Sequence, residues 1–375
     1  MTATYDVVVA GLGAMGSATL CELARRGHRV LGLDRFTPPH DRGSSHGRSR
    51  IIREAYFEEP RYVPLVRRAY ECWARLEEES GARLFRRTGG LSFGPQGGEL
   101  FDGARRSAEL HGLAHEVLSA DEIRARVPAL QPEPGMLGVW EPRAGMLAPE
   151  AAIAAALDVA HRHGAEVRPG EGLTGWRATG GGIEVTTAER RVTAGRLVLA
   201  VGAWTGQLLA ELALPLAVQR NVLLWFDPLR PELFTPDRFP VFLCEYEPGR
   251  AWYGFPDTGE GVKLALHDFS VTTSVDRLDR DVAPADVDAV RALIRRFLPA
   301  ADGPVRTSAV CMYTSTPDGH FVLDRHPAHA DVVVASPCSG HGFKFASALG
   351  EVLADLATDA TPAFDLSPFA LARFA

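Results

Sequence analysis

The chain has 375 residues, of which 46% are hydrophobic and 23% are charged, and its formal net charge is −7. This length is enough for one large domain or two intertwined domains with a substantial core. The acidic balance gives no global attraction to nucleic acid or to anionic membranes, so neither is expected as a partner. The sequence shows no signal-peptide pattern and no apolar run of about 18 residues, which favours a cytoplasmic protein without a membrane span.

The cysteines and histidines form no recognisable metal or disulfide pattern. Five cysteines are scattered without a CxxC pair, at positions Cys21, Cys72, Cys244, Cys311 and Cys338. An odd and dispersed set suits a reducing compartment, where most thiols are small buried hydrophobes. The twelve histidines are equally dispersed, so no metal site is predicted.

The N-terminal segment has the pattern of a dinucleotide-binding unit. A strand over residues 5–10 leads into a GxGxxG turn, then a helix is predicted, and a second strand ends in Asp34. In such a unit Gly11 permits the tight turn, Gly13 lets the backbone approach the pyrophosphate, and Gly16 lets the helix pack on the strand. The helix N-terminus offers free N–H groups to the phosphates, and the Asp34 carboxylate is expected to accept hydrogen bonds from the ribose. This motif alone does not separate FAD from NAD.

A cationic loop follows, over residues 37–53 (TPPHDRGSSHGRSRIIR). Small residues and glycines separate its cationic and histidine side chains, which are Arg42, His46, Arg48, Arg50 and Arg53. One interpretation is a solvated basic loop. The other is a loop over the cofactor, with its cations directed at the cofactor or at an anionic substrate.

Five longer motifs make the chain similar to one family. They are GSSHGRSRIIREAY (43–56), WYGFP (252–256), VKLALH (262–267), CMYTSTPDGHFVLD (311–324) and SGHGFKFAS (339–347). In this order and spacing they resemble the monomeric sarcosine oxidase and N-methyl-L-tryptophan oxidase family, FAD-dependent amine oxidases of the D-amino-acid oxidase-like superfamily. The resemblance covers essentially the whole chain.

The expected fold is α/β, or α+β overall, with a Rossmann-like FAD-binding domain and a second, discontinuous substrate domain of mixed β-sheet plus helices. The strand, glycine loop and helix near the C-terminus are expected to join the sheet of the N-terminal unit. Residues 220–226, 252–255 and 262–269 are predicted antiparallel strands. The predicted FAD-binding domain comprises 1–82, 150–217 and 325–375, and the substrate domain comprises 83–149 and 218–324. The active site is expected between them.

The resemblance implies a flavoprotein oxidoreductase that oxidises an N-methyl or secondary amino acid with O2. Hydride transfer to FAD would give an imine, and O2 would then be reduced to hydrogen peroxide. A small-molecule amine and O2 are the expected partners, and a monomer is expected. The family's FAD is held by an 8α-S-cysteinyl bond, which the match places on Cys311. Taken alone, Cys311 lies in a β-like run and would be interpreted as an inert buried thiol.

Further roles are carried over from the family. The predicted catalytic residues are Lys263, Arg50, His46, His267, Tyr253 and Tyr313. The predicted substrate-binding residues are Arg53, Lys344, Tyr253 and Tyr313, with Arg53 and Lys344 holding the substrate carboxylate. The predicted cofactor-binding residues are Gly11, Gly13, Gly16, Asp34, Ser44, Ser49, Arg50, Cys311, Gly340, Gly342 and Lys344. In this family the counterpart of Lys263 is associated with oxygen activation.

The residues also agree with the chemistry of amine oxidation. Hydride removal requires the neutral amine, and cationic walls disfavour its ammonium form. A fixed positive charge near the flavin would stabilise negative charge developing on O2. Lys263 and His267 are four residues apart in an alternating segment, so one strand face should carry both. The alternative is a solvent-facing pair on a half-exposed strand.

Some residues depart from the family pattern. Ser45, Arg48 and Ser49 stand where the family often has histidine, aspartate and threonine, and Arg48 could alter the electrostatics of the loop. The size of the substrate pocket is expected to depend on Leu243, Trp252 and Cys338. Three other functions stay open: a biosynthetic flavoenzyme that oxidises a ring amine without N-demethylation, a non-catalytic flavoprotein subunit, and a nicotinamide dehydrogenase.

Overall fold

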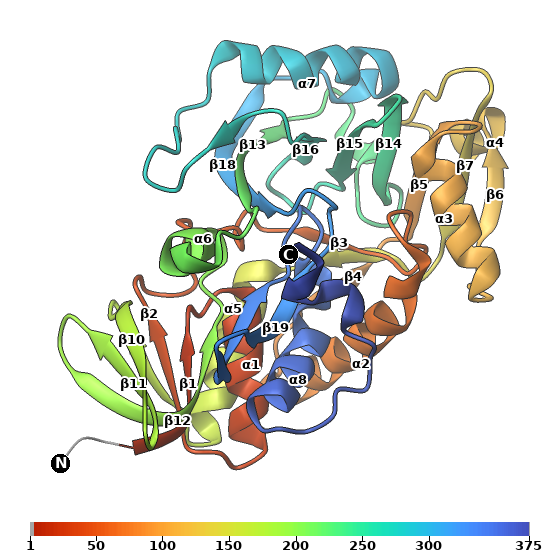
Figure 1. Cartoon of the computed structure of the whole chain (residues 1–375). Coiled ribbons are helices and arrows are strands. Elements are labelled where there is room, and N and C mark those ends of the chain that lie inside the picture. Colours follow the sequence, from red (N-terminus) through yellow and green to blue (C-terminus); the bar gives the residue numbers. More distant parts are fainter. Residues whose placement is uncertain (1–3, 375) are drawn as a thin grey trace.

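The computed structural model describes residues 4–374, and its first sheet is centred on parallel strands (Figure 1). Their order is β9 (Glu166–Pro169), β2 (Val30–Asp34), β1 (Thr4–Ala10), β12 (Arg191–Leu199) and β20 (His329–Ser336). All of β2 and the last four residues of β1 are buried, as expected of parallel strands covered on both faces. A hairpin of β10 (Leu173–Thr179) and β11 (Gly182–Thr187) joins the first half of β12, and β19 (Val322–His326) pairs with β20.

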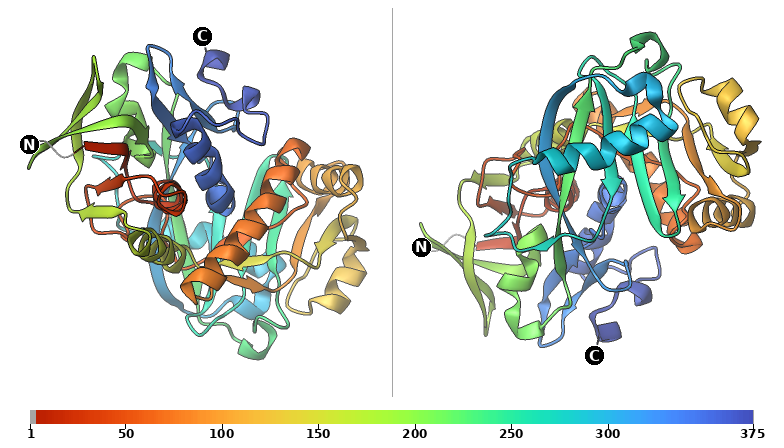
Figure 2. Two further views of the ribbon diagram at one scale, coloured as in Figure 1. Left: turned by 90° about the horizontal axis from the view of Figure 1, so that it is seen from below. Right: turned by 90° about the horizontal axis from the view of Figure 1, so that it is seen from above.

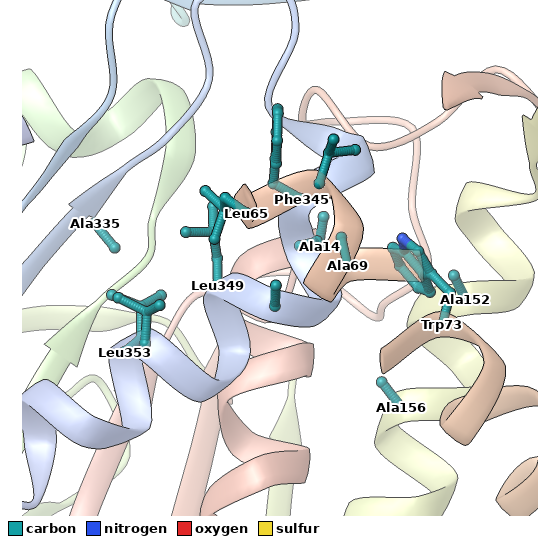
Figure 3. Close-up of a cluster of buried hydrophobic side chains, with 14 of the residues drawn as sticks. Ala14, Leu65, Ala69, Trp73, Ala152, Ala156, Ala335, Phe345, Leu349 and Leu353 are labelled. Atoms are coloured by element: carbon teal, nitrogen blue, oxygen red, sulfur yellow. The ribbon is translucent and has the colours of Figure 1, made fainter. Parts of the chain in front are cut away.

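Helices α1 (Ala14–Arg25), α5 (Pro149–Arg162) and α8 (Ala346–Ala357) pack together beside this sheet, with α2 (Val63–Ser80) against α5 and α8. In the left view of Figure 2, the red α1 lies between the yellow-green α5 and the blue α8. Figure 3 shows the core between them, where Leu349 and Leu353 of α8 and Trp73 of α2 lie among alanines. A Cβ at Gly350 would lie 2.8 Å from the backbone of Ala18, so this glycine permits the close contact of α8 with α1.

The second sheet has the order β17 (Thr272–Thr273), β13 (Ala217–Phe226), β16 (Val262–His267), β15 (Arg250–Phe255), β14 (Val241–Glu247), β5 (Gly90–Pro95), β7 (Met136–Glu141) and β6 (Glu116–Ser119). The long strand β18 (Val305–Ser315) pairs antiparallel with β13. Helix α7 (Pro284–Phe297) lies across this sheet in the right view of Figure 2. Helices α3 (Glu99–Leu110) and α4 (Ala120–Arg126) lie beside β5, β6 and β7.

Alternation along the strands gives the second sheet two different faces. Leu224, Trp252 and Leu264 belong to the hydrophobic core under α7. Their strand neighbours point the other way, because successive side chains alternate across a sheet. Among those neighbours, Tyr253 lines a cavity and Lys263 contacts the cationic loop.

A small third sheet places the cationic loop. It consists of β3 (Arg50–Ile52), β8 (Gly145–Leu147) and β4 (Phe85–Arg87), in the order β3-β8-β4. Because β3 begins at Arg50, the preceding residues run directly into an ordered strand. The short helix α6 (Thr205–Leu208) follows β12 and completes the α-helices between residues 4 and 374, which also contain short 3₁₀ helices.

The predicted fold class is confirmed, and the middle strands β13, β15 and β16 are antiparallel as expected. The first sheet draws its strands from residues 4–34, 166–199 and 322–336, and the second draws them from 90–141 and 217–315. The proposed domain bounds remain a prediction, since membership of a sheet does not set a domain boundary. Within residues 4–374, no helix combines the length and the apolar character that crossing a membrane requires.

Candidate active site

A continuous cavity begins at the glycine-rich turn after β1. Gly11 has φ +86°, and a Cβ there would lie 2.5 Å from the carbonyl oxygen of Ala200. A Cβ at Gly16 would lie 1.7 Å from Gly11 O, so Gly16 allows α1 to pack on the turn without itself lining the cavity. The cavity therefore reaches bare backbone and the start of α1, which is the surface that a pyrophosphate needs.

Asp34 ends β2 and lies in the wall of the same cavity. Its Oδ2 accepts a hydrogen bond from Leu12 N at 2.7 Å, and its Oδ1 accepts one from Phe36 N at 2.7 Å. His40 Nε2 is 3.4 Å from Oδ1. The carboxylate is thus held by backbone on both sides, where the sequence predicted a ribose contact.

Arg50 is held by two carbonyl groups of the cationic loop. Its Nη1 donates to Ser49 O at 2.8 Å and its Nη2 donates to Ser44 O at 2.7 Å. The same Nη2 lies 3.6 Å from the Sγ of Cys311, which belongs to β18. The loop therefore carries a fixed positive charge beside this thiol.

Cys311 is the one cysteine among the described residues whose thiol pKa is lowered. Burial acts to raise the pKa of Cys311, but the His46 imidazole and the positive charge of Arg50 outweigh it, and the pKa falls to about 7. The pKa values of Cys21, Cys72, Cys244 and Cys338 are all raised, first of all by burial. Thiolate is the nucleophilic form of cysteine, and the lowered pKa favours this form at Cys311 over the other cysteines.

His46 does not line the cavity, although it was predicted as a catalytic residue. It is buried, and its Nε2 has no hydrogen-bond partner among residues 4–374. A buried polar atom without a partner normally carries a free-energy cost. Its influence here is on Cys311, whose pKa it lowers.

Lys263 lies between β13 and β15, opposite Trp225 and Phe255 in the sheet register. It is only 2% exposed, so the alternative of a solvent-facing lysine is wrong. Its Nζ donates to Gly47 O at 2.7 Å, Ser49 O at 2.9 Å and Ser49 Oγ at 3.1 Å. Burial, followed by the charge of Arg50, lowers the pKa of Lys263 well below its usual value.

Arg53 and Lys344 lie at the other end of the cavity. The Arg53 Nη2 donates to both carboxylate oxygens of Glu58, at 2.9 and 2.7 Å, so an internal acid occupies the predicted carboxylate-binding group. Burial acts to raise the pKa of Glu58, but Arg53 opposes it and the pKa is lowered to about 2. Lys344 Nζ donates to His341 O at 2.7 Å. Burial and then Arg53 lower the pKa of Lys344 to about 7.

An aromatic wall joins the two ends of the cavity. Tyr253, Tyr313 and His267 line it, and His267 Nδ1 lies 3.3 Å from the Tyr313 hydroxyl. Burial raises the pKa values of both tyrosines and lowers that of His267 to about 4, so all three are neutral near pH 7. Phe269, which is 41% exposed, packs edge-on against His267 at 4.8 Å between ring centroids.

The glycine turn before α8 closes the cavity on the remaining side. Gly340 has φ +76°, and a Cβ there would lie 3.0 Å from both His267 and Tyr313. A Cβ at Gly342 would lie 1.7 Å from Pro337 O, so this position also excludes a side chain. Gly340 thus lets backbone, rather than a side chain, approach the aromatic wall, and Gly342 lets the turn fold closely on itself.

Most of the predicted site residues meet in this cavity. It is lined by Gly11, Gly13, Asp34, Ser44, Ser49, Arg50, Arg53, Tyr253, His267, Cys311, Tyr313, Gly340, Gly342 and Lys344. Gly16, His46 and Lys263 stand immediately behind residues that line it. Leu243 and Cys338 do line the cavity, but the prediction for Trp252 was wrong, because its side chain is buried under α7 instead.

Two acids in the site were not predicted. Glu58 pairs with Arg53, and Glu150, at the start of α5, accepts hydrogen bonds from Gly47 N and Arg48 N. Neither lies in a pattern that indicates a partner, and 103 residues separate Glu150 from Gly47. Arg48 itself points away, with its Nη1 3.4 Å from Glu260, so its charge is not directed at the cavity.

Residues 6–356 match the family described as FAD dependent oxidoreductase. The chain belongs to this family. It is 43% identical to the monomeric sarcosine oxidase of Streptomyces avermitilis, over 100% of this chain and 99% of that protein. It is 34% identical to the N-methyl-L-tryptophan oxidase of Salmonella arizonae, over 99% of each chain. The solved structure of NikD, an unusual amino acid oxidase essential for nikkomycin biosynthesis, is similar with a TM-score of 0.85 and 27% identity, over 98% of each chain.

Membership of this family confirms FAD as the cofactor and rules against the nicotinamide dehydrogenase. The geometry fits FAD, because a bare-backbone cradle at one end leads to a reactive thiol and a cationic pocket at the other. Gly11, Gly13 and the start of α1 would hold the pyrophosphate, and Arg50 and the turn at Gly340 would border the flavin ring. When bound, the flavin supplies a two-electron acceptor for the substrate.

Proposed function

We propose that this chain is a monomeric oxidase of an N-methyl or secondary amino acid, which converts the amine and O2 into an imine and hydrogen peroxide. One observation carries the proposal: the cavity places a cradle for FAD, the Cys311 thiol and a cationic pocket in one continuous space. Relatives named sarcosine oxidase and N-methyl-L-tryptophan oxidase support this substrate class. Water would hydrolyse the imine, which releases formaldehyde when the substrate carries an N-methyl group.

Arg53 and Lys344 are proposed to bind the substrate carboxylate. An arginine fork binds a planar carboxylate with two parallel hydrogen bonds. The Nη2 of Arg53 already donates to both carboxylate oxygens of Glu58, so a substrate carboxylate would compete with this internal acid. The ammonium of Lys344 makes one hydrogen bond within residues 4–374, to His341 O, and so retains N–H groups for an anion.

The wall between these anchors and Cys311 suits a neutral amine. Tyr253, Tyr313 and His267 are uncharged near pH 7, so none of them stabilises an ammonium ion as a carboxylate would. The charges of Arg50, Arg53 and Lys344 act against the ammonium form, and burial adds to the effect. The neutral amine has the lone pair that stabilises the developing iminium during hydride transfer.

Cys311 is proposed to bond the flavin through its sulfur. Forming a thioether to the 8α carbon removes one hydrogen from the thiol and one from the 8α methyl group, and O2 accepts both as hydrogen peroxide. The lowered pKa of Cys311 supports the required thiolate near neutral pH.

Lys263 is proposed to promote the reaction with O2. A fixed positive charge in a dry site stabilises negative charge as it develops on oxygen. Burial lowers the pKa of Lys263, and three loop oxygens and the rings of Trp225 and Phe255, 5.4 and 4.6 Å from Nζ, stabilise the ammonium form against this effect. Removal of the Lys263 charge should therefore slow flavin reoxidation by O2 more than it slows flavin reduction by the amine.

The test uses the purified chain. Acid precipitation of wild type should leave the yellow flavin with the protein, whereas Cys311→Ala should release it to the supernatant. Sarcosine, N-methyltryptophan and pipecolate are then compared for peroxide release. Complete loss of flavin from wild type would contradict the thioether. The absence of peroxide with every amine would favour the non-catalytic flavoprotein.

A second candidate is an oxidase of a cyclic amine in a biosynthetic route, and the similarity to NikD, an amino acid oxidase essential for nikkomycin biosynthesis, supports the biosynthetic part of it. Both candidates release peroxide, but only N-demethylation releases formaldehyde. Peroxide from pipecolate without formaldehyde, together with no reaction of sarcosine, would favour this second function.

A further inference from the structure

Glu150 does not line the cavity, but it contacts the loop whose oxygens surround the Lys263 Nζ. It is the second residue of α5, after Pro149, and its side chain is half-buried. Its Oε1 accepts hydrogen bonds from Gly47 N at 2.7 Å and from Arg48 N at 3.0 Å.

The backbone at this contact has an unusual shape. Gly47 has φ +98° and Arg48 has φ +68°, so two successive residues occupy the left-handed region. For arginine this region is unfavourable, and surrounding contacts must hold it. Successive N–H groups that converge on one oxygen form an anion-binding concavity, and here Glu150 is the anion.

The same residues carry the acceptors of Lys263. Gly47 O lies on the opposite side of the loop from the amides that Glu150 binds, and Ser49 supplies the other two acceptors. The loop has little room to move sideways, since a Cβ at Gly47 would meet Leu223 at 2.4 Å and Lys263 Nζ at 3.6 Å. The position of Lys263 Nζ therefore depends on the shape of residues 47–49.

We propose that Glu150 is a positioning residue for the reaction with oxygen: it holds residues 47–49 in the conformation that fixes the Lys263 ammonium. This inference rests on the proposed oxidase function. It predicts that the geometry of Glu150 matters more than its charge, because a single oxygen, Oε1, accepts both hydrogen bonds. Among the described residues, Arg53 donates to Ala55 and Glu58 and Lys344 donates to His341, so neither of these proposed carboxylate-binding groups donates to residues 47–49.

Two variants separate geometry from charge. Glu150→Gln keeps an acceptor oxygen and removes the charge, whereas Glu150→Ala removes both. Glu99→Ala is the matched control, because Glu99 is an exposed acid in the first turn of another helix, α3. On each flavin-loaded protein, stopped-flow spectroscopy measures flavin reduction by the best amine and reoxidation by O2, and hydrogen exchange measures protection of the peptide that contains Gly47 and Arg48.

In Glu150→Ala, reoxidation should slow about tenfold or more, since a misplaced donor to developing charge loses most of its effect. Reduction should change less than about threefold, and the peptide should exchange faster. Glu150→Gln and Glu99→Ala should resemble wild type in all three measurements. The inference is wrong if Glu150→Ala reoxidises like wild type, if reduction slows equally, or if Glu150→Gln loses as much as Glu150→Ala. If no amine reduces wild type, the proposed function fails, and hydrogen exchange alone still decides whether Glu150 holds the loop.

Discussion

Two buried lysines belong to the same site, and their surroundings differ. Lys263 is 2% exposed and Lys344 is 6% exposed, so burial does not distinguish them. Three oxygens of a single loop surround the Lys263 ammonium, and aromatic rings cover its remaining sides. Lys344 has one carbonyl partner and stands beside the Arg53–Glu58 pair in the cavity wall.

The difference indicates what each lysine is able to bind. An ammonium has three donors, and the three oxygens around Lys263 occupy them, so we propose that this lysine acts through its charge. Lys344 has N–H groups left for a ligand anion, and its neighbour Arg53 is paired with the Glu58 carboxylate. The surroundings of Lys263 therefore suit a small neutral molecule such as O2, and those of Lys344 suit an amino-acid carboxylate.

The largest effect is expected for Lys263→Met, which removes the fixed charge with little change in side-chain volume. Flavin reoxidation by O2 should slow about 100-fold, in line with the loss of a preorganised electrostatic group. Reduction by the amine should stay within about threefold, because Arg53 and Lys344 are untouched. Anaerobic stopped-flow reduction followed by mixing with O2 measures both steps. Equal losses in the two steps would refute the division between the lysines.

A smaller effect is expected for Lys344→Met. The loss of one charge-assisted hydrogen bond of about 1.5–3 kcal/mol to the substrate carboxylate should lower kcat/KM about 10- to 100-fold, with reoxidation unchanged. Amines without a carboxylate should lose much less. If both substrate types lost the same amount, Lys344 would not be the carboxylate anchor.

The pH dependence of kcat/KM provides a control for the proposed role of Lys344. Burial, then Arg53, lowers the pKa of Lys344 to about 7, so the cationic form is present below pH 7 and is lost as the pH rises through it. In wild type, kcat/KM for a carboxylate substrate should therefore contain a factor that declines above about pH 7. Lys344→Arg should remove this decline while retaining anion binding, because arginine stays protonated. An unchanged profile in Lys344→Arg would assign the decline to another group.

The smallest effect is expected for Glu58→Gln. This change removes the anion that competes with substrate for Arg53, so KM for a carboxylate substrate should fall about threefold, the size expected of one modest ion pair. Breaking a largely buried pair also leaves Arg53 less compensated, so the melting temperature should fall. Steady-state kinetics and thermal unfolding measure the two changes. A raised KM would mean that Glu58 orients Arg53 for the substrate and does not compete with it.

Local patterns in the sequence predicted the cofactor end of this site more completely than the substrate end. Gly11, Gly13 and Asp34 lie within one strand–helix–strand unit, so their spacing alone places them together. Lys263 and Cys311 could be assigned only by resemblance, because their partners lie in a loop more than 200 residues away.

The contacts that sequence analysis missed are also long-range or irregular. Glu150 reaches back to Gly47 through an unusual loop conformation, and no periodic pattern marks such a contact. Trp252 was misplaced because the side chains of its strand alternate, and one step along β15 separates the cavity from the core under α7. The face of the sheet on which a side chain lies can be predicted once the register of the strand is known, but the sequence does not provide that register.

The most direct test of the division between the two lysines compares Lys263→Met and Lys344→Met in both half-reactions, under one set of conditions. Four rate constants are measured: reduction by a carboxylate-bearing amine and reoxidation by O2, for each variant relative to wild type. We predict that Lys263→Met slows only reoxidation and that Lys344→Met slows only reduction at subsaturating amine. If both variants slow the same step, the separation of oxygen and carboxylate functions between the two lysines is wrong.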